Sequence, residues 1–255
     1  MMDKKILFYK KNGFLKIKLF NKKEINLFKK IIASDLKRKF LNKFKRKLNF
    51  EKLENYHKLK ISENEHKYVV NPSHRYFAFN KKIVKKILNS KIIDLIENEW
   101  GHSKISLNWI GDLKKKQKIK DATGYRIARP KLNKVNDIAG VHIDVNAGGI
   151  INKDLKSSLT IWIPIVGFSK KFTLKISPKS HTKIHDVKFK KTKKKVTPLL
   201  SEKYWKKFKF QRLDYKPGEA LIFHPNLLHG GSVNYGSKTR ISLDTRVLNL
   251  KRFKY

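Results

Sequence analysis

Eight short apolar runs follow one another between Ile105 and Leu248, and turn residues separate them. Each run has the length of a β-strand and is too short for an ordinary helix. Short strands at such regular spacing are typical of an all-β double sheet or barrel. The runs are Ile105–Ile110, Gly124–Ala128, Gly140–Val145, Ser158–Val166, Phe172–Ile176, Phe210–Tyr215, Ala220–Phe223 and Arg240–Leu248.

The first hundred residues have a different pattern, with apolar residues at helical spacing. Asn21 precedes Lys22-Lys23-Glu24, which is typical of a helix N-cap with an acidic residue in the first turn. The stripe that follows predicts one helix, and Ala78–Glu99 predicts a second. We expect one domain over residues 1–255, with a largely helical part at 1–100 and a β core at 101–255. The stripe consists of Ile25, Phe28, Ile32 and Leu36.

The net charge of +42 is extreme for a chain of 255 residues. Dense Lys and Arg favour nucleic-acid binding, because they neutralise phosphates and release counterions. Only nine of the 62 basic residues are Arg, however, the residue that binds phosphates and bases in a bidentate manner. The Lys residues are spread over the whole chain, as a compositional bias produces. We therefore expect a small-molecule substrate rather than nucleic acid, with the positive field favouring anions.

Several classes of protein are excluded by what the sequence lacks. There is no Cys, so disulfides and thiolate metal sites are absent. No apolar run is long enough for a transmembrane helix or a signal peptide, so we expect no membrane span and a cytoplasmic location. The mostly Lys segment 188–196 predicts a solvated loop between two strands, with a specific phosphate site as the alternative. The oligomeric state stays open.

Three residues have the pattern of a metal site. Two imidazoles and one carboxylate form the facial triad that binds non-haem Fe(II) and leaves positions open. His142 and Asp144 are two residues apart, and in a strand such side chains share a face. His229 is the expected third ligand, because Gly230-Gly231 after it allows close backbone approach. His224, five residues earlier, is the alternative.

The last apolar run begins with an arginine. A buried Arg in a β core needs an anionic partner, and its planar guanidinium suits a carboxylate. We expect Arg240 to bind the distal carboxylate of a 2-oxoglutarate co-substrate, with Ser242 on the same face as a second donor. Arg246 shares that face, and it either contacts substrate or forms an ion pair.

In their order, these residues and several segments around them resemble the phytanoyl-CoA dioxygenase-like (PhyH) branch of Fe(II)/2-oxoglutarate oxygenases. Ser177-Pro178-Lys179-Ser180-His181 is similar to the Pro-Gly-Ser-His segment of that family, with Lys179 in place of Gly. Phe168–Leu174 departs from the family by lacking an Asn-Gly pair, so substrate contacts there are not transferred. The other similar segments are Asn12–Ile17, His142–Asp144, Leu159–Ile165 with its central Trp162, Tyr215–Phe223, Leu228–Ser232, and Asn234 with Arg240 and Ser242.

The resemblance implies a mainly β fold with α, in which N-terminal helices pack on one sheet of a double-stranded β-helix (jelly-roll, cupin-like) core. It implies Fe(II), 2-oxoglutarate and O2, with His142, Asp144 and His229 as metal ligands. It implies that Arg240 and Ser242 bind the co-substrate. Asp144 favours hydroxylation or another oxidation over halogenation, because halogenating relatives lack this carboxylate. Candidate substrate-binding residues are Arg126, Arg129, Asn146, Trp162 and Arg246, with ordinary ion pairing as the alternative for the two arginines of Tyr125–Pro130.

The sequence thus predicts a dioxygenase that hydroxylates a small, polar or anionic metabolite, such as a sugar, an amino acid or a natural-product precursor. Two alternatives stay open. A nucleic-acid oxidative dealkylase fits the charge, and Arg240–Arg246 resembles the paired-arginine strand of that branch. A non-catalytic jelly-roll binding protein would keep the shape without turnover.

Overall fold

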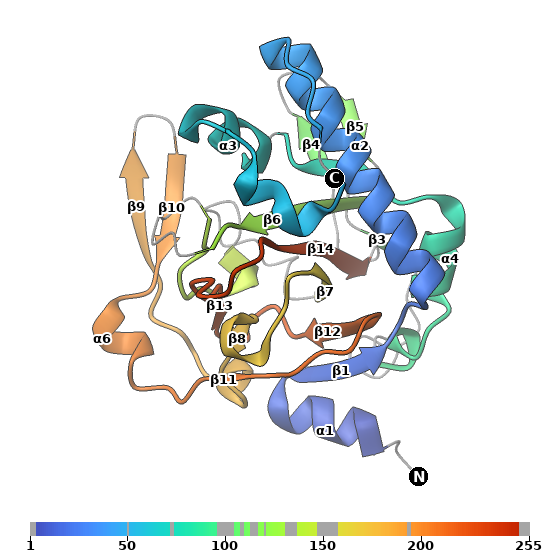
Figure 1. Cartoon of the computed structure of the whole chain (residues 1–255). Coiled ribbons are helices and arrows are strands. Elements are labelled where there is room, and N and C mark those ends of the chain that lie inside the picture. The colour runs from blue at the N-terminus through green and yellow to red at the C-terminus, as the bar shows by residue number, and fades with distance from the viewer. Residues whose placement is uncertain are drawn as a thin grey trace.

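A large antiparallel sheet forms the centre of the molecule in the computed structural model (Figure 1). Its strands run in the order β1-β12-β7-β14-β6-β2, and β3 pairs with β14. A smaller sheet, β11-β8-β13, lies beside it, and two hairpins, β4–β5 and β9–β10, complete the strands. The structure describes residues 4–49, 51–71, 74–95, 105–107, 110–112, 117–119, 121–130, 137–146, 158–192 and 195–249.

The strands are β1 (Phe14–Lys18), β2 (Tyr76–Ala78), β3 (Ile105–Leu107), β4 (Ile110–Asp112), β5 (Gln117–Ile119), β6 (Ala122–Ala128), β7 (Ser158–Val166), β8 (Lys175–Ile176), β9 (Lys188–Thr192), β10 (Lys195–Leu199), β11 (Gln211–Arg212), β12 (Glu219–Phe223), β13 (His229–Gly230) and β14 (Arg240–Asn249). The α-helices are α1 (Lys4–Asn12), α2 (Lys22–Phe44), α3 (Glu63–Val70), α4 (Lys81–Leu88) and α6 (Glu202–Trp205). Short 3₁₀ turns are η1 (Leu53–Lys58), η2 (Asp144–Asn146), η4 (Lys170–Phe172) and η5 (Ser180–Thr182).

Helix α2 confirms the helix predicted after Asn21. The Asn21 side chain accepts a hydrogen bond from the Glu24 amide at 2.9 Å, and the Glu24 carboxylate accepts one from the Asn21 amide at 2.8 Å. This reciprocal capping box satisfies two amides that the first helical turn leaves without partners. All four residues of the predicted stripe are buried, and Phe28, Ile32 and Leu36 are fully so.

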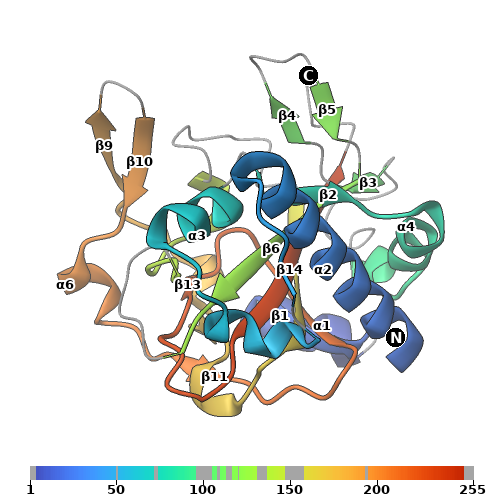
Figure 2. The ribbon, with the colours of Figure 1, turned by 45° about the horizontal axis from the view of Figure 1, so that its top comes forward.

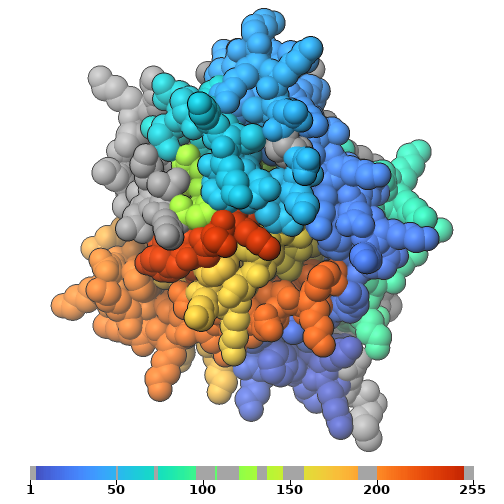
Figure 3. Space-filling view, viewed as in Figure 1, coloured from blue at the N-terminus to red at the C-terminus, as the bar shows by residue number. Residues whose placement is uncertain are grey.

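Two apolar clusters of the core lie on opposite faces of the large sheet. On one face, α2 packs with α3 against the strands, and its apolar stripe joins Ile161 of β7 and Ile241 of β14 in one cluster (Figure 2). In the space-filling view, the blue and cyan side chains of the N-terminal helices cover the upper and right part of the molecule (Figure 3). On the other face, Trp162 and Phe223 pack with Ile176 of the small sheet. The space between the two sheets is where the candidate site lies.

Several predicted elements are wrong in detail. Gly140–Val145 is not a strand, because the amides of Asp144 and Val145 both donate to the Pro225 carbonyl, at 2.7 and 3.1 Å, and curl the chain into η2. The described residues of the Lys-rich segment, 188–192 and 195–196, do not form a loop but belong to the paired strands β9 and β10. Its charge indicates solvation, whereas the backbone conformation is decided by pairing between its two halves.

Other boundaries moved as well. The run Ile105–Ile110 is divided between β3 and β4, and the runs at 172–176 and 210–215 shorten to β8 and β11. The predicted helix Ala78–Glu99 begins later, at Lys81, where the Asn80 side chain caps it, and it ends earlier, at Leu88. Residues 96–99 lie outside the described part. Within the described residues, no helix has both the length and the apolar character to cross a membrane.

Candidate active site

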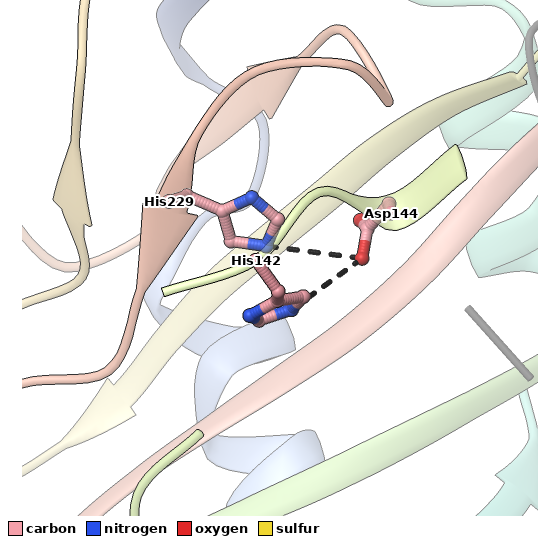
Figure 4. Close-up of side chains that lie close together, drawn as sticks. All are labelled: His142, Asp144 and His229. Carbon is pink, nitrogen blue, oxygen red and sulfur yellow. Dashed lines mark ion pairs between the residues drawn. The ribbon is translucent and has the colours of Figure 1, made fainter. Parts of the chain in front are cut away.

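Three side chains meet between the two sheets: His142, Asp144 and His229 (Figure 4). One ligand atom from each lies within 4.8 Å of the others. The Nε2 atoms of His142 and His229 are 3.7 and 3.8 Å from the same oxygen, Oδ1 of Asp144. Within the described part of the chain, this is the group of His, Asp and Glu side chains whose spacing could hold a metal ion.

A short backbone bridge brings the two histidines together. The amide of His142 donates to the His229 carbonyl at 2.9 Å, and the amide of His229 donates to the His142 carbonyl at 3.1 Å. The following glycines allow this approach. A Cβ on Gly230 would lie 3.1 Å from the Gly140 carbonyl oxygen, and a Cβ on Gly231 would lie 2.6 Å from Cγ2 of Ile138. Any larger side chain would push the two segments apart.

Hydrogen bonds to backbone carbonyls orient both imidazoles. Nδ1 of His142 lies 2.7 Å from the Gly140 carbonyl oxygen, and Nδ1 of His229 lies 2.9 Å from that of Leu227. A carbonyl oxygen only accepts, so each Nδ1 carries the proton and each Nε2 keeps its lone pair. Both lone pairs are therefore available to a metal beside Asp144.

The carboxylate of Asp144 is buried and held at both oxygens. Thr160 of β7 donates to Oδ2 at 2.5 Å, and Nη2 of Arg246 lies 3.1 Å from Oδ1. Burial alone would raise the pKa of Asp144, but the charges of Arg246, His229 and His142 and the Thr160 bond hold it well below its usual range. The carboxylate is thus ionised at neutral pH.

The two histidines are held neutral at the same pH. Burial, reinforced by the nearby His229, lowers the pKa of His142 to about 4. Burial likewise lowers the pKa of His229, against the opposing effect of Asp144. The set is one anion and two neutral imidazoles, which is the protonation state a divalent metal requires.

The triad opens onto a cavity between the sheets. Its empty space, with the open mouth included, is about 570 Å³. Arg240 and Ser242 of β14 line it together with Trp162, Leu174 and Phe223. The cavity therefore combines a metal-type cluster, an arginine and an apolar wall.

Arg240 is 7% exposed and donates a hydrogen bond to the Phe172 carbonyl. Burial lowers its pKa to about 10, although Asp137 opposes that shift. Among the described residues, no carboxylate forms an ion pair with Arg240. A buried guanidinium in this situation is suited to an anionic ligand. Ser242, also buried, lies two residues further along the strand and faces the same cavity.

The other predicted substrate residues are placed differently from one another. Trp162 and Arg126 line the cavity, and Arg126 forms an ion pair with Asp244 at 3.2 Å. Arg246 pairs with Asp144, as described above. Arg129 instead binds Asp137 at 2.7 Å and Glu63 at 2.8 Å. The side chain of Asn146 lies outside the described residues.

His224, the alternative third ligand, lies elsewhere. Its Nδ1 accepts a hydrogen bond from the Asn226 amide at 3.0 Å, and its ring is 5.4 Å from the ring of His181. Sequence reasoning did not single out Thr160 or Asp244. Alternation along the strands could have found both, since Thr160 is two residues from Trp162 and Asp244 lies between Ser242 and Arg246.

The phytanoyl-CoA dioxygenase (PhyH) family matches residues 9–242. The chain belongs to this family. Membership in the PhyH family confirms the resemblance read from the sequence and makes the protein an iron- and 2-oxoglutarate-dependent dioxygenase. A comparison with curated protein sequences found no match.

Solved structures of similar fold include PhyH-like oxygenases and confirm the predicted jelly-roll core. EctD from S. alaskensis, solved with bound Fe, is 11% identical with a TM-score of 0.60, over 100% of this chain and 79% of EctD. The non-heme alpha-ketoglutarate-dependent carbocyclase SnoK from nogalamycin biosynthesis is 13% identical with a TM-score of 0.56, over 98% and 84%. AviO1 from Streptomyces viridochromogenes Tue57 is 13% identical with a TM-score of 0.55, over 96% and 93%.

Proposed function

We propose that this PhyH-family enzyme hydroxylates a small, polar or anionic metabolite in the cavity between the two sheets. The observation that carries the proposal is that the buried triad and the buried Arg240 open onto one cavity. A metal-type cluster and a buried cation on one cavity suit a co-substrate with one chelating end and one carboxylate end. That description fits 2-oxoglutarate.

His142, Asp144 and His229 would hold Fe(II). Two neutral imidazoles and one carboxylate are the ligands of the facial triad, and the protonation states described above match it. Bound there with 2-oxoglutarate, Fe(II) would supply the O2-dependent oxidation of a C–H bond, with succinate and CO2 as by-products. The carboxylate of Asp144 favours hydroxylation, since halogenating relatives lack it.

Arg240 would bind the distal carboxylate of 2-oxoglutarate. Its guanidinium is buried, so without an anion it leaves a desolvated charge. A carboxylate matches its planar donors, and the Ser242 hydroxyl can donate to the same group from the same strand face. The pair would thereby fix the orientation of the co-substrate against the triad.

The apolar wall would exclude water from the reacting centre. Trp162 and Phe223 belong to the apolar cluster that includes Ile176 of the small sheet. Both side chains line the cavity together with Leu174. A dry, closed site protects an oxidising centre from side reactions. The structures of similar fold include EctD solved with 2-oxoglutarate and 5-hydroxyectoine, which supports a small polar molecule as the substrate here.

The test is Fe(II)-dependent conversion of 2-oxoglutarate to succinate, screened against a panel of small metabolites. We expect at least one anionic or polar metabolite to raise succinate formation above its level without substrate. Asp144→Ala should abolish that increase, while Asp186→Ala, an exposed carboxylate outside the site, should preserve it. The metal-ligand assignment is contradicted if the Asp144→Ala enzyme still couples 2-oxoglutarate decarboxylation to substrate oxidation at the wild-type rate. Gel shifts at physiological salt test the nucleic-acid alternative, and binding there would favour it.

A further inference from the structure

We propose that the cavity holds a second anion site, formed by Arg126 and Arg246, which binds an oxyanion group of the substrate, a carboxylate or a phosphate. This inference rests on the proposed function, because the substrate would bind in the same cavity. The two arginines lie on the neighbouring strands β6 and β14, with Asp244 between them.

The alternation of β14 places this group beside the triad. Arg240, Ser242 and Asp244 are two residues apart and all line the cavity. Arg246, the next residue in this series, contacts Oδ1 of Asp144 at 3.1 Å. Arg126 is opposite Ser242 in the β6–β14 register, so its guanidinium enters the cavity next to the co-substrate residues.

Both arginines have donors to spare. A guanidinium carries five N–H donors. Among the described residues, Arg126 makes one ion pair, with Oδ2 of Asp244 at 3.2 Å, and Arg246 makes one, with Asp144. Nε of Arg246 is buried and has no hydrogen-bond partner in the described part of the chain. Buried donors of this kind are costly unless a ligand accepts from them.

The charges around the cavity leave a positive surplus. Asp137 is neutralised by Arg129, which it contacts at 2.7 Å. Asp144 is likewise contacted by Arg246 at 3.1 Å, from outside the described cavity wall. The charges that remain on the described wall are those of Arg126 and Arg240 against the carboxylate of Asp244. Fe(II) and the doubly charged 2-oxoglutarate cancel each other, so the surplus persists in the loaded site. A substrate with an anionic group would balance it.

Asp244 makes the proposal distinctive, because it competes with the substrate anion for Arg126. Removing Arg126 and removing Asp244 should therefore change anion affinity in opposite directions. If this ion pair had only a structural role, both substitutions would weaken anion binding. If the overall positive charge of the protein attracted the anion instead, both substitutions would change anion affinity only slightly, because that general field does not depend on this cavity.

The experiment uses the full chain loaded with Mn(II) and saturating 2-oxoglutarate under argon, at constant ionic strength. Inorganic phosphate and acetate are titrated by calorimetry, with acetamide as the neutral probe. We expect one of the two anions to bind and acetamide not to bind. Arg126→Gln should weaken that binding about tenfold or more, Arg126→Lys less, and Asp244→Asn should strengthen it. Arg38→Gln, which removes the same charge from the exposed face of α2, should leave it unchanged.

Several results would overturn the inference. Arg126→Gln and Arg38→Gln could have equal effects, which would assign the binding to the general field. Asp244→Asn could weaken anion binding as much as Arg126→Gln does. Arg126→Gln could weaken the binding of 2-oxoglutarate instead, which would place Arg126 in the co-substrate site. Folding of each variant is checked by its Mn(II) affinity. If 2-oxoglutarate itself does not bind, the proposed function fails; if it binds and neither anion does, this inference alone fails.

Discussion

Thr160 offers a sharp test of how this fold prepares its metal site. The residue is 5% exposed on β7 and donates a hydrogen bond to Oδ2 of Asp144 at 2.5 Å. The other oxygen, Oδ1, is the one that faces both Nε2 atoms. Thr160 therefore controls the rotation of the carboxylate that presents Oδ1 to a metal. Thr160→Val removes the hydroxyl and keeps the shape, whereas Thr160→Ser keeps the hydroxyl and removes a methyl group.

The magnitude follows from the charge on the acceptor. A hydrogen bond to an ionised group contributes about 1.5–3 kcal/mol, and each 1.4 kcal/mol is about a factor of ten in affinity. We expect Thr160→Val to weaken Fe(II) or Mn(II) binding by roughly 10- to 100-fold, in line with other outer partners of metal ligands. Thr160→Ser should change it by less than about threefold, since its hydroxyl still reaches the carboxylate.

Anaerobic titration calorimetry at pH 7 measures both affinities, and urea unfolding of the metal-free proteins measures their stability separately. Metal-free Thr160→Val should lose about 1–3 kcal/mol of unfolding free energy, because a buried carboxylate loses a donor. The reasoning is refuted if Thr160→Val binds metal within twofold of wild type. It is also refuted if Thr160→Ser is as weak as Thr160→Val, because packing rather than the hydrogen bond would then be responsible.

Three further predictions concern backbone strain, pH and close packing. Lys179 has a φ of 64°, where a side chain costs about 1 kcal/mol. Lys179→Gly should therefore raise the melting temperature. The control Lys183→Gly, at an ordinary φ of −92°, should lower it. His224 has a pKa that burial lowers to about 4; the unfolded chain, with a value of about 6.5, then binds the proton more readily. Metal-free stability should therefore fall as pH drops from about 6.5 to about 4, by no more than about 3 kcal/mol for this group, and urea titrations of His224→Gln should show a smaller fall. Gly231→Ala places a Cβ 2.6 Å from Ile138, so calorimetry should show weaker metal binding, and unchanged affinity would contradict the close approach.

Local sequence determined the elements whose formation needs only neighbouring residues. Asn21 with Glu24 and the stripe that follows predicted the start and the buried face of α2, because capping and helical periodicity are short-range effects. The long apolar run at Ser158–Val166 was found with the bounds of β7 for the same reason. Residue type, the two-residue spacing of His142 and Asp144 and the glycines after His229 likewise predicted His142, Asp144 and His229 as metal ligands.

The local pattern was misleading where a distant partner decided the conformation. The Pro225 carbonyl accepts hydrogen bonds from the amides of Asp144 and Val145. The Asp144 carboxylate therefore reaches the histidines from a 3₁₀ turn and not from a strand. The Lys-rich segment pairs with itself as β9–β10, because its ladder depends on register rather than on charge.

The ion pairs of the arginines likewise depend on the tertiary structure. Arg126 and Arg129 look equivalent in the sequence, yet Arg126 meets Asp244, 118 residues away, and Arg129 meets Asp137 and Glu63. Coulomb energy depends on distance in space, which periodicity along the chain does not report. The sequence by itself determined the family and its chemistry, and it predicted the residues that would carry that chemistry. The tertiary structure decided which of the charges around the cavity pair with one another, and that pairing is the basis of the proposed anionic substrate group.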